Sequence, residues 1–196
     1  MLQWLIQWFT ENYIEVMASL TGIIAIFFQI KVKPIYWPIS IINVILYIFV
    51  FYQARLYAEI SLQVYYLVMS IYGWIFWLKK TNNKSIPISK TTLKMWITII
   101  TIVPVIWLSM AFLLKKYSNT DVPFIDSFLT TLSFVATYLL ARKKIENWLI
   151  WIFVDFTSIG LYCYKELYAT IILFVILTIL AILGYKEWKK ILYVST

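Results

Sequence analysis

The sequence predicts an all-α integral membrane protein with seven transmembrane helices, and its composition is the first reason. Of the 196 residues, 63% are hydrophobic and only 13% are charged. Soluble domains are about 45–50% apolar and about 25% charged. The mean hydropathy of +0.83 agrees, because a soluble globule of this length cannot bury so much apolar surface. The composition therefore excludes a soluble enzyme, a disordered chain and a nucleic-acid-binding domain.

The length and order of the apolar runs are the second reason. A helix crosses a bilayer with about 20 mainly apolar residues, and the runs lack the alternation of a membrane barrel. In chain order the predicted spans are 15–30, 35–52, 57–78, 96–114, 122–141, 148–164 and 167–185. Pro104 is a candidate kink in the fourth span. The short amphipathic stretch 1–10 predicts an interfacial helix or an extension of the first span.

Lys and Arg predict the orientation of these spans. Of the 17 basic residues, one side of the membrane receives only Arg55, Lys115, Lys116 and Lys165. The remaining basic residues fall on the other side, and cytoplasmic loops are the ones enriched in Lys and Arg. We therefore expect an outside N-terminus and a cytoplasmic C-terminus. The net charge of +8 then reflects cytoplasmic loops. Because the first basic residue is Lys31, we expect the N-terminus to be retained, since a cleavable signal peptide needs early positive charge.

Missing residue types narrow the chemistry. The chain has no histidine and a single cysteine, Cys163. It therefore lacks the ligands of a typical zinc site and the partners of a catalytic triad or an internal disulfide. No phosphate-binding GxxxxGK[S/T] loop occurs among its residues. We expect no enzymatic activity, no cofactor and no metal.

An internal repeat gives the third reason for the predicted fold. Shifting the chain by 111 residues aligns the basic turn at 31–33 with 142–144, and the triplet Leu-Tyr-Ala at 56–58 with 167–169. The same shift pairs Trp37 with Trp148, Gly73 with Gly184, and Trp77 with Trp188. The sequence thus predicts a 3+1+3 arrangement, with repeats at 15–78 and 122–185 and a linker helix at 96–114. The linker reverses the chain once, so both repeats enter the membrane in the same direction, as in the SWEET sugar transporters. Such a parallel repeat favours a transporter with a central site; the alternative is a duplicated bundle without transport.

Asp155 is the strongest candidate for a functional residue. It lies near the middle of the sixth span, where a carboxylate is costly and rarely persists without a partner or a water-filled cavity. No Lys or Arg lies at a similar depth in any span, so a cationic substrate is one way to balance it; the alternative is a hydrogen bond to a neighbouring helix. Trp148 and Trp151 continue its helical face, and tryptophan faces attract flat cations. Asn43 and Gln63 are candidates either for the same cavity or for bonds between helices.

Two segments resemble the PnuC family of bacterial vitamin transporters. The first is NVILYIFVFYQARLYAEISLQVYYLVMSIYGWIFW at 43–77, and the second is ARKKIENWLIWIFVDFTSIGLYCYKELYA at 141–169. The resemblance covers about residues 15 to 190. It implies a homotrimer in the bacterial inner membrane that imports nicotinamide riboside by facilitated diffusion, with cytoplasmic phosphorylation trapping the substrate. It also implies a substrate site in each protomer formed by Asn43, Gln63, Trp74, Trp148, Trp151 and Asp155.

Several alternatives stay open at this level. Related carriers, often called PnuT, take thiamine, which is also a flat cation, whereas riboflavin is neutral and gains less from Asp155. A retinal-type receptor needs a lysine in the middle of the last span, and 167–185 contains none. A membrane enzyme needs clustered acid, base or metal residues, which the spans do not offer.

Overall fold

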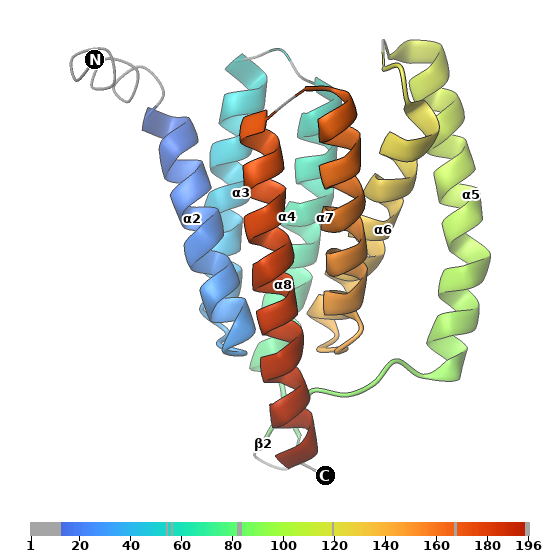
Figure 1. Cartoon of the computed structure of the whole chain (residues 1–196). Coiled ribbons are helices and arrows are strands. Elements are labelled where there is room, and N and C mark those ends of the chain that lie inside the picture. Colours follow the sequence, from blue (N-terminus) through green and yellow to red (C-terminus); the bar gives the residue numbers. More distant parts are fainter. Residues whose placement is uncertain are drawn as a thin grey trace. The chain divides into compact units, whose positions relative to one another are not determined.

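The chain folds into helices at each of the seven places predicted to span a membrane. The computed structural model describes residues 13–53, 55, 57–81, 84–118, 120–166 and 168–194; the helix expected at 1–10 lies outside them. The described elements are α2 (Tyr13–Ile30), α3 (Tyr36–Gln53), α4 (Tyr57–Leu78), β1 (Lys80–Thr81), β2 (Lys84–Ser85), α5 (Leu93–Tyr117), α6 (Pro123–Ala141), α7 (Asn147–Tyr164) and α8 (Tyr168–Val194) (Figure 1). The two strands form a short antiparallel hairpin.

Five of these helices are long and apolar enough to cross a membrane. They are α3, the Glu59–Leu78 part of α4, α5, α6, and the Thr170–Val194 part of α8. The apolar part of α2, Val16–Ile30, is shorter, and α7 carries the buried polar residues Asn147 and Asp155. Length and composition therefore support five of the seven predicted spans directly, while α2 and α7 occupy the predicted positions with shorter or more polar sequences.

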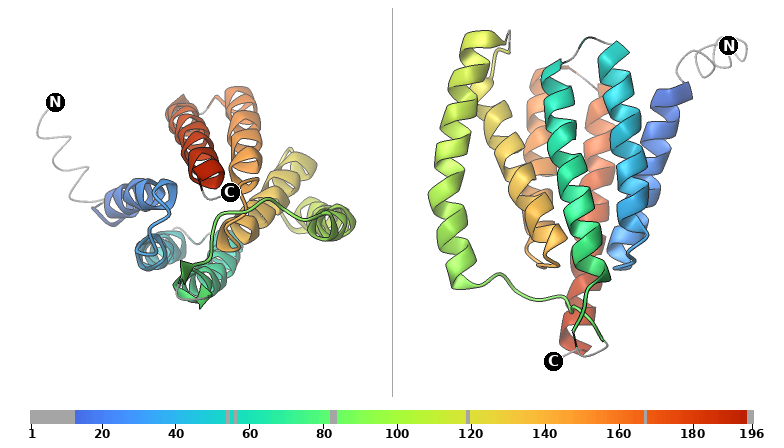
Figure 2. Two further views of the ribbon diagram at one scale, coloured as in Figure 1. Left: turned by 90° about the horizontal axis from the view of Figure 1, so that it is seen from below. Right: turned by 180° about the vertical axis from the view of Figure 1, so that it is seen from behind.

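The helices group into two compact units. The first unit is Met1–Ile86 and the second is Pro87–Thr196. In the first, α3 packs against both α2 and α4; in the second, α5 packs on α6, α6 on α7, and α7 on α8. Figure 2 shows α5 beside α6 within the second unit. The helix predicted as a linker between repeats thus belongs to the second unit, and the indole nitrogen of Trp107 donates to the carbonyl of Phe124 at 2.8 Å to hold it there.

The turns of the two units have the same local backbone. Positive φ occurs at Val32 and Lys143 (55° and 52°), and again at Arg55 and Glu166 (58° and 56°). Each pair is separated by the 111 residues of the sequence shift. Residues other than glycine rarely adopt positive φ, so its recurrence at both turns marks equivalent helix ends. Helices α3 and α7 also have the same length, 18 residues.

A buried triad of two tryptophans and one glycine fixes a helix pair in each unit. In the first unit the rings of Trp37 and Trp77 meet edge to face at 5.4 Å, and in the second Trp148 meets Trp188 at 5.7 Å. All four rings are buried. Because the glycine has no side chain, the ring of Trp148 lies directly on the α8 backbone, where a Cβ at Gly184 would stand 2.5 Å from it.

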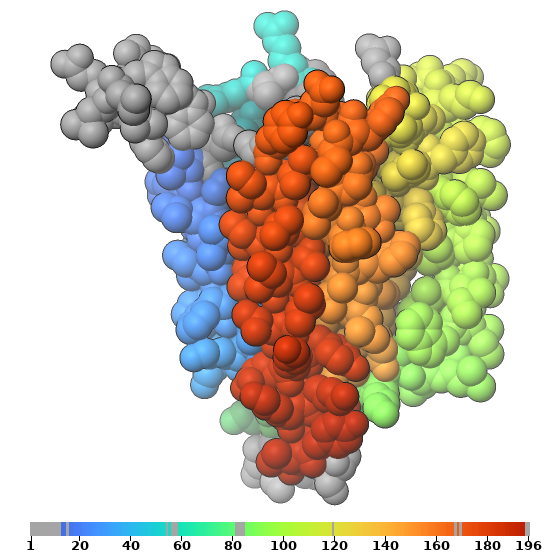
Figure 3. Space-filling view, in the orientation of Figure 1, coloured from blue at the N-terminus to red at the C-terminus, as the bar shows by residue number. Residues whose placement is uncertain are grey.

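The helix surfaces outside these contacts are apolar. Along α8 the exposed side chains include Ile172, Leu173, Ile176 and Ile179, and α8 occupies the front of the space-filling view (Figure 3). Lipid tails are as apolar as these side chains, so such a surface is compatible with a bilayer. The packing within each unit instead relies on small residues, tryptophans and hydrogen bonds between helices.

Candidate functional site

Asp155 lies in the middle of α7 and is 5% exposed. In the part of the chain that the structure describes, the ion pairs join Lys165 to Asp121 and Asp126, and Lys190 to Glu187; none reaches Asp155. A charged group inside a membrane costs about 2.5–3.5 kcal/mol on insertion scales and normally faces a partner or a cavity. The Asp155 carboxylate therefore offers a negative charge that the described side chains leave unbalanced.

Two tryptophans precede Asp155 on α7, and they have different environments. Trp151 is one helical turn away from Asp155 and half-buried. Trp148 is only 2% exposed, because its ring packs on Gly184 and against Trp188. One indole is therefore available beside the carboxylate, whereas the other holds α7 on α8.

Asn43 forms a hydrogen bond between helices in the first unit. Its amide nitrogen donates to the carbonyl of Ala18 at 2.5 Å and to the Thr21 hydroxyl at 3.1 Å. Gly22 makes room for this approach, since a Cβ there would lie 3.3 Å from the amide nitrogen. Both acceptors are on α2, so this amide joins α3 to α2, which is one of the two roles expected from the sequence.

Gln63 and Trp74 share one face of α4. They are eleven residues apart, which is close to three full turns of an α-helix. Gln63 is half-buried and Trp74 is 37% exposed. Nearby on this helix, the Ser70 hydroxyl lies 3.1 Å from that of Ser40 on α3. The sequence-predicted residues thus fall into two sets, with Asn43, Gln63 and Trp74 in the first unit and Trp148, Trp151 and Asp155 in the second.

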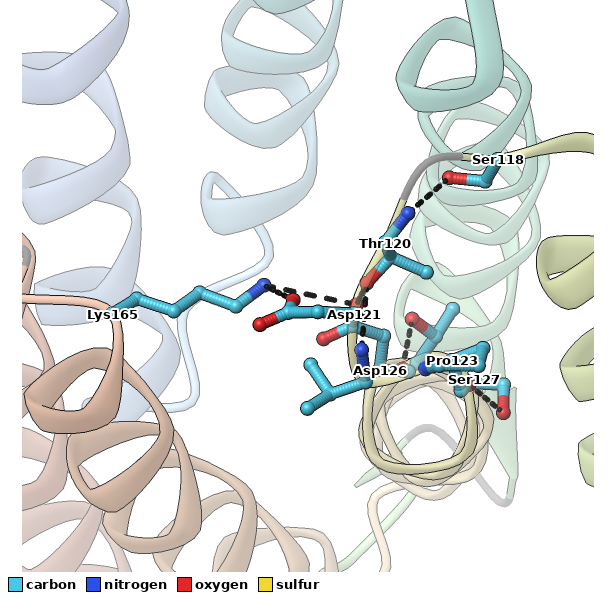
Figure 4. A network of polar contacts seen from close by, with 9 residues as sticks. Ser118, Thr120, Asp121, Pro123, Asp126, Ser127 and Lys165 are labelled. Atoms are coloured by element: carbon cyan, nitrogen blue, oxygen red, sulfur yellow. Dashed lines mark hydrogen bonds and ion pairs between the residues drawn. The ribbon is translucent and has the colours of Figure 1, made fainter.

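A polar network closes one end of the second unit (Figure 4). The ammonium of Lys165 lies 3.5 Å from Asp121 and 4.0 Å from Asp126. Asp126 also accepts a 2.5 Å hydrogen bond from the Thr120 hydroxyl. The network connects the α7–α8 turn with the start of α6. The Asp126 side chain is 28% exposed, so water reaches this network.

Sequence reasoning missed a second polar network at the α6–α7 turn. There Glu146 accepts hydrogen bonds from the backbone nitrogen and the hydroxyl of Thr91. Lys144 donates to the Ser89 hydroxyl at 2.8 Å. Partial burial lowers the pKa of Lys144, an effect that nearby Glu146 opposes. Burial also lowers the pKa of Lys143. The segment ARKKIENW held the relevant residues, but their partners are far away in sequence.

Comparison with known proteins identifies the family. The model of the family described as nicotinamide mononucleotide transporter matches residues 12–190. The chain belongs to this family. The family resemblance inferred from 43–77 and 141–169 is therefore confirmed, and with it the assignment to multi-pass membrane transporters.

Curated members of the family align with nearly the whole chain. The nicotinamide riboside transporter PnuC of Escherichia coli is 26% identical over 90% of this chain and 85% of its own length. PnuC of Neisseria mucosa is 22% identical over 92% of this chain and 73% of its own length. The crystal structure of the vitamin B3 transporter PnuC has the same fold, with a TM-score of 0.75 and 21% identity over 98% of this chain and 87% of that one.

Proposed function

We propose that this chain imports nicotinamide riboside across a bacterial inner membrane by facilitated diffusion. Phosphorylation in the cytoplasm then traps the substrate. The observation that carries the proposal is the buried Asp155, which the described side chains leave without an ion-pair partner. The relatives of this chain are named as nicotinamide riboside transporters, which supports the same substrate.

The charge and shape of the substrate match the α7 face. Nicotinamide riboside contains a pyridinium ring, a flat cation that balances the Asp155 carboxylate. The indole of Trp151, one turn away, adds a cation–π contact, which is worth up to about 2 kcal/mol when the pair is desolvated. The substrate thereby removes the cost of the buried charge while it is bound.

The same face favours the riboside over the mononucleotide. Nicotinamide mononucleotide adds an anionic phosphate to the riboside. The helices that carry the candidate residues, 36–53, 57–78 and 147–164, contain no Lys or Arg, and neither does the neighbouring segment 168–185. A phosphate near Asp155 would therefore meet a like charge without a compensating base, which is unfavourable in a medium of low dielectric constant.

We propose that the chain is built from two parallel three-helix repeats, 15–78 and 122–185, connected by the helix at 96–114, in a SWEET-like arrangement. The repeated turns and tryptophan triads support this duplication. The N-terminus lies outside and the C-terminus in the cytoplasm, and the protein forms a homotrimer. The residues of the proposed site are Asn43, Gln63, Trp74, Trp148, Trp151 and Asp155.

Within this site we assign different roles to these residues. Asp155 and Trp151 bind the pyridinium ring, and Gln63 and Trp74 contact the ribose or carboxamide from the shared face of α4. Asn43 and Trp148 complete the site. The Asn43 hydrogen bond to α2 and the packing of the Trp148 ring on α8 keep the surrounding helices in place. Transport occurs when the bound substrate becomes accessible from one side of the membrane and then from the other.

Thiamine is the second candidate substrate, because it too is a flat cation that satisfies Asp155. Calorimetric titration of the detergent-purified protein with nicotinamide riboside, nicotinamide mononucleotide and thiamine separates the possibilities. We expect heat of binding with the riboside alone. Binding of thiamine alone would move the protein to the thiamine carriers while leaving the fold and the role of Asp155 in place. Preferential binding of the mononucleotide would contradict the charge argument.

A further inference from the structure

A short segment before α5 is bound to the turn between α6 and α7. We call residues 87–92 the strap. The backbone nitrogen of Ser89 donates to the carbonyl of Lys143 at 3.1 Å, and the nitrogen of Ile145 donates to the carbonyl of Ser89 at the same distance. Ser89 and Lys144 thus form a parallel bridge. The strap is seated in the protein, since Ile88 is only 4% exposed.

Side chains reinforce this bridge from both ends of the turn. The Glu146 carboxylate accepts from the Thr91 backbone nitrogen at 2.9 Å and from its hydroxyl at 2.7 Å. The Lys144 ammonium donates to the Ser89 hydroxyl at 2.8 Å and to the carbonyl of Lys90 at 3.1 Å. Hydrogen bonds to charged groups are stronger than those between neutral groups. We call these contacts between the strap and the turn the clamp.

The clamp involves the residue at which α7 begins. Glu146 is the N-cap of α7, but its side chain makes no capping bond to the helix, because its carboxylate binds the strap. The Asn147 amide closes the turn by donating to the carbonyl of Lys144 at 2.6 Å. Trp151 and Asp155 follow on the same helix, about one and two turns from its start. Any rotation at the turn therefore changes the direction in which both side chains point.

We propose that Lys144 and Glu146 are positioning residues for transport. By holding the strap, they fix the rotation and depth of α7, so that Trp151 and Asp155 meet the substrate, and the clamp stays closed throughout the transport cycle. This proposal rests on the function proposed above. It is specific to the second repeat, because the position equivalent to Glu146 is Ile35, whose side chain accepts no hydrogen bond.

A reversible cross-link tests whether the clamp stays closed. The variant carries Ser89→Cys and Lys144→Cys in a Cys163→Ala background, because paired residues of a β-bridge lie within the range of Cα separations that a disulfide spans. Uptake of radiolabelled nicotinamide riboside is measured in cells before and after oxidation. We expect the oxidised protein to take up the riboside at least as well as the reduced protein, which lacks the Lys144 contacts of the clamp. Loss of uptake on oxidation, restored by a reductant, would show that the strap must leave the turn and would overturn the proposal.

Opening the clamp tests whether it positions α7. We expect Glu146→Ala to raise the apparent KM for uptake about tenfold through the loss of hydrogen bonds to a charged acceptor, with Glu146→Gln partly restoring it. Glu187→Ala is the matched control, because Glu187 is an exposed acid paired with Lys190 on α8. An unchanged KM in Glu146→Ala at normal protein levels would contradict the positioning role.

A second readout does not depend on the identity of the substrate. In the Cys163→Ala background, Trp151→Cys is labelled with a small thiol reagent, with and without Glu146→Ala. We expect opening the clamp to change the labelling rate at this position, and Glu187→Ala to leave it unchanged. If the wild-type protein takes up no riboside while the labelling rate still responds to the clamp, the proposed substrate fails and the positioning role stands. Equal labelling rates in both backgrounds would overturn the positioning role.

Discussion

The two units share the backbone of their turns and a tryptophan–glycine contact but differ in where they place polar groups. Both contain a buried tryptophan–glycine–tryptophan triad and turns with matching positive φ. In the first unit, the Asn43 amide donates to α2, and the hydroxyls of Ser40 and Ser70 bond to each other. In the second, Asp155 is buried on α7 without an ion-pair partner among the described residues, while charged side chains bind at both ends of the helices.

This difference separates the features that the two units share from those that differ between them. Helix packing is retained, because a change in a triad disturbs two helices at once. Polar positions diverge, because one carboxylate is enough to balance one cation. The position equivalent to Asp155 is Val44, which is also buried. The two units therefore share their turns and tryptophan packing, and the sharpest electrostatic feature belongs to the second.

Neutralising Asp155 would remove that feature and has the largest expected effect. We expect Asp155→Asn to weaken binding of nicotinamide riboside by at least about 30-fold, since breaking a buried charge pair costs about 2–5 kcal/mol. The reduced riboside, whose dihydropyridine ring is neutral, should lose much less. Calorimetry with both ligands measures the contrast, and Asp126→Asn controls for the loss of a carboxylate elsewhere in the unit. Equal losses for the two ligands would contradict the charge-pairing role.

Adding a methyl group at the glycine of each triad tests whether the two triads contribute equally to stability. We expect Gly73→Ala and Gly184→Ala each to destabilise the protein by about 1–3 kcal/mol, because the added methyl group overlaps a buried tryptophan ring. Gly160→Ala is the matched control, since a Cβ there meets no atom within 4 Å. Thermal unfolding of the purified variants ranks their stabilities. A Gly160→Ala variant as unstable as the other two would show that space at the glycine is not the cause.

Removing the Asn43 amide tests the polar contact of the first unit. We expect Asn43→Val to lower stability by about 0.6 kcal/mol, the average for hydrogen bonds between membrane helices. Thermal unfolding and riboside titration on the same sample distinguish its two possible roles. A small loss of stability with unchanged affinity indicates a bond to α2 alone. A large loss of affinity at unchanged stability would instead indicate that Asn43 contacts the substrate.

The smallest effect is expected at the polar network of Lys165. We expect Lys165→Met to lower stability by about 0.2–1 kcal/mol, because its partner Asp121 is 56% exposed and water screens the pair. Raising the salt concentration should reduce the difference between the variant and the wild-type protein. A large loss that salt does not change would show that this network holds α6 and the α7–α8 turn together more strongly than its exposure suggests.

Much of the fold was predictable because its signals are local. The apolar runs predicted each described helix, and the shift of 111 residues paired the two basic turns and the tryptophans and glycines that the structure packs together in each unit. Asp155 was predictable as a functional candidate, because it is a carboxylate in an otherwise apolar span. The different burial of Trp148 and Trp151 was not predictable, because both are tryptophans of one helix. Only the position of Gly184 on α8 determines which ring is buried.

The sequence by itself determined the helices, the recurring turns and the presence of the Asp155 carboxylate inside an apolar helix. Hydropathy and helical spacing are properties of neighbouring residues, so they can be read along the chain. Only the tertiary structure decided that Asn43 bonds to α2 and that Glu146 binds Thr91, 55 residues away, instead of capping its own helix. Such pairings depend on which turns and helix faces the fold brings within hydrogen-bond distance, and no local pattern encodes that distance.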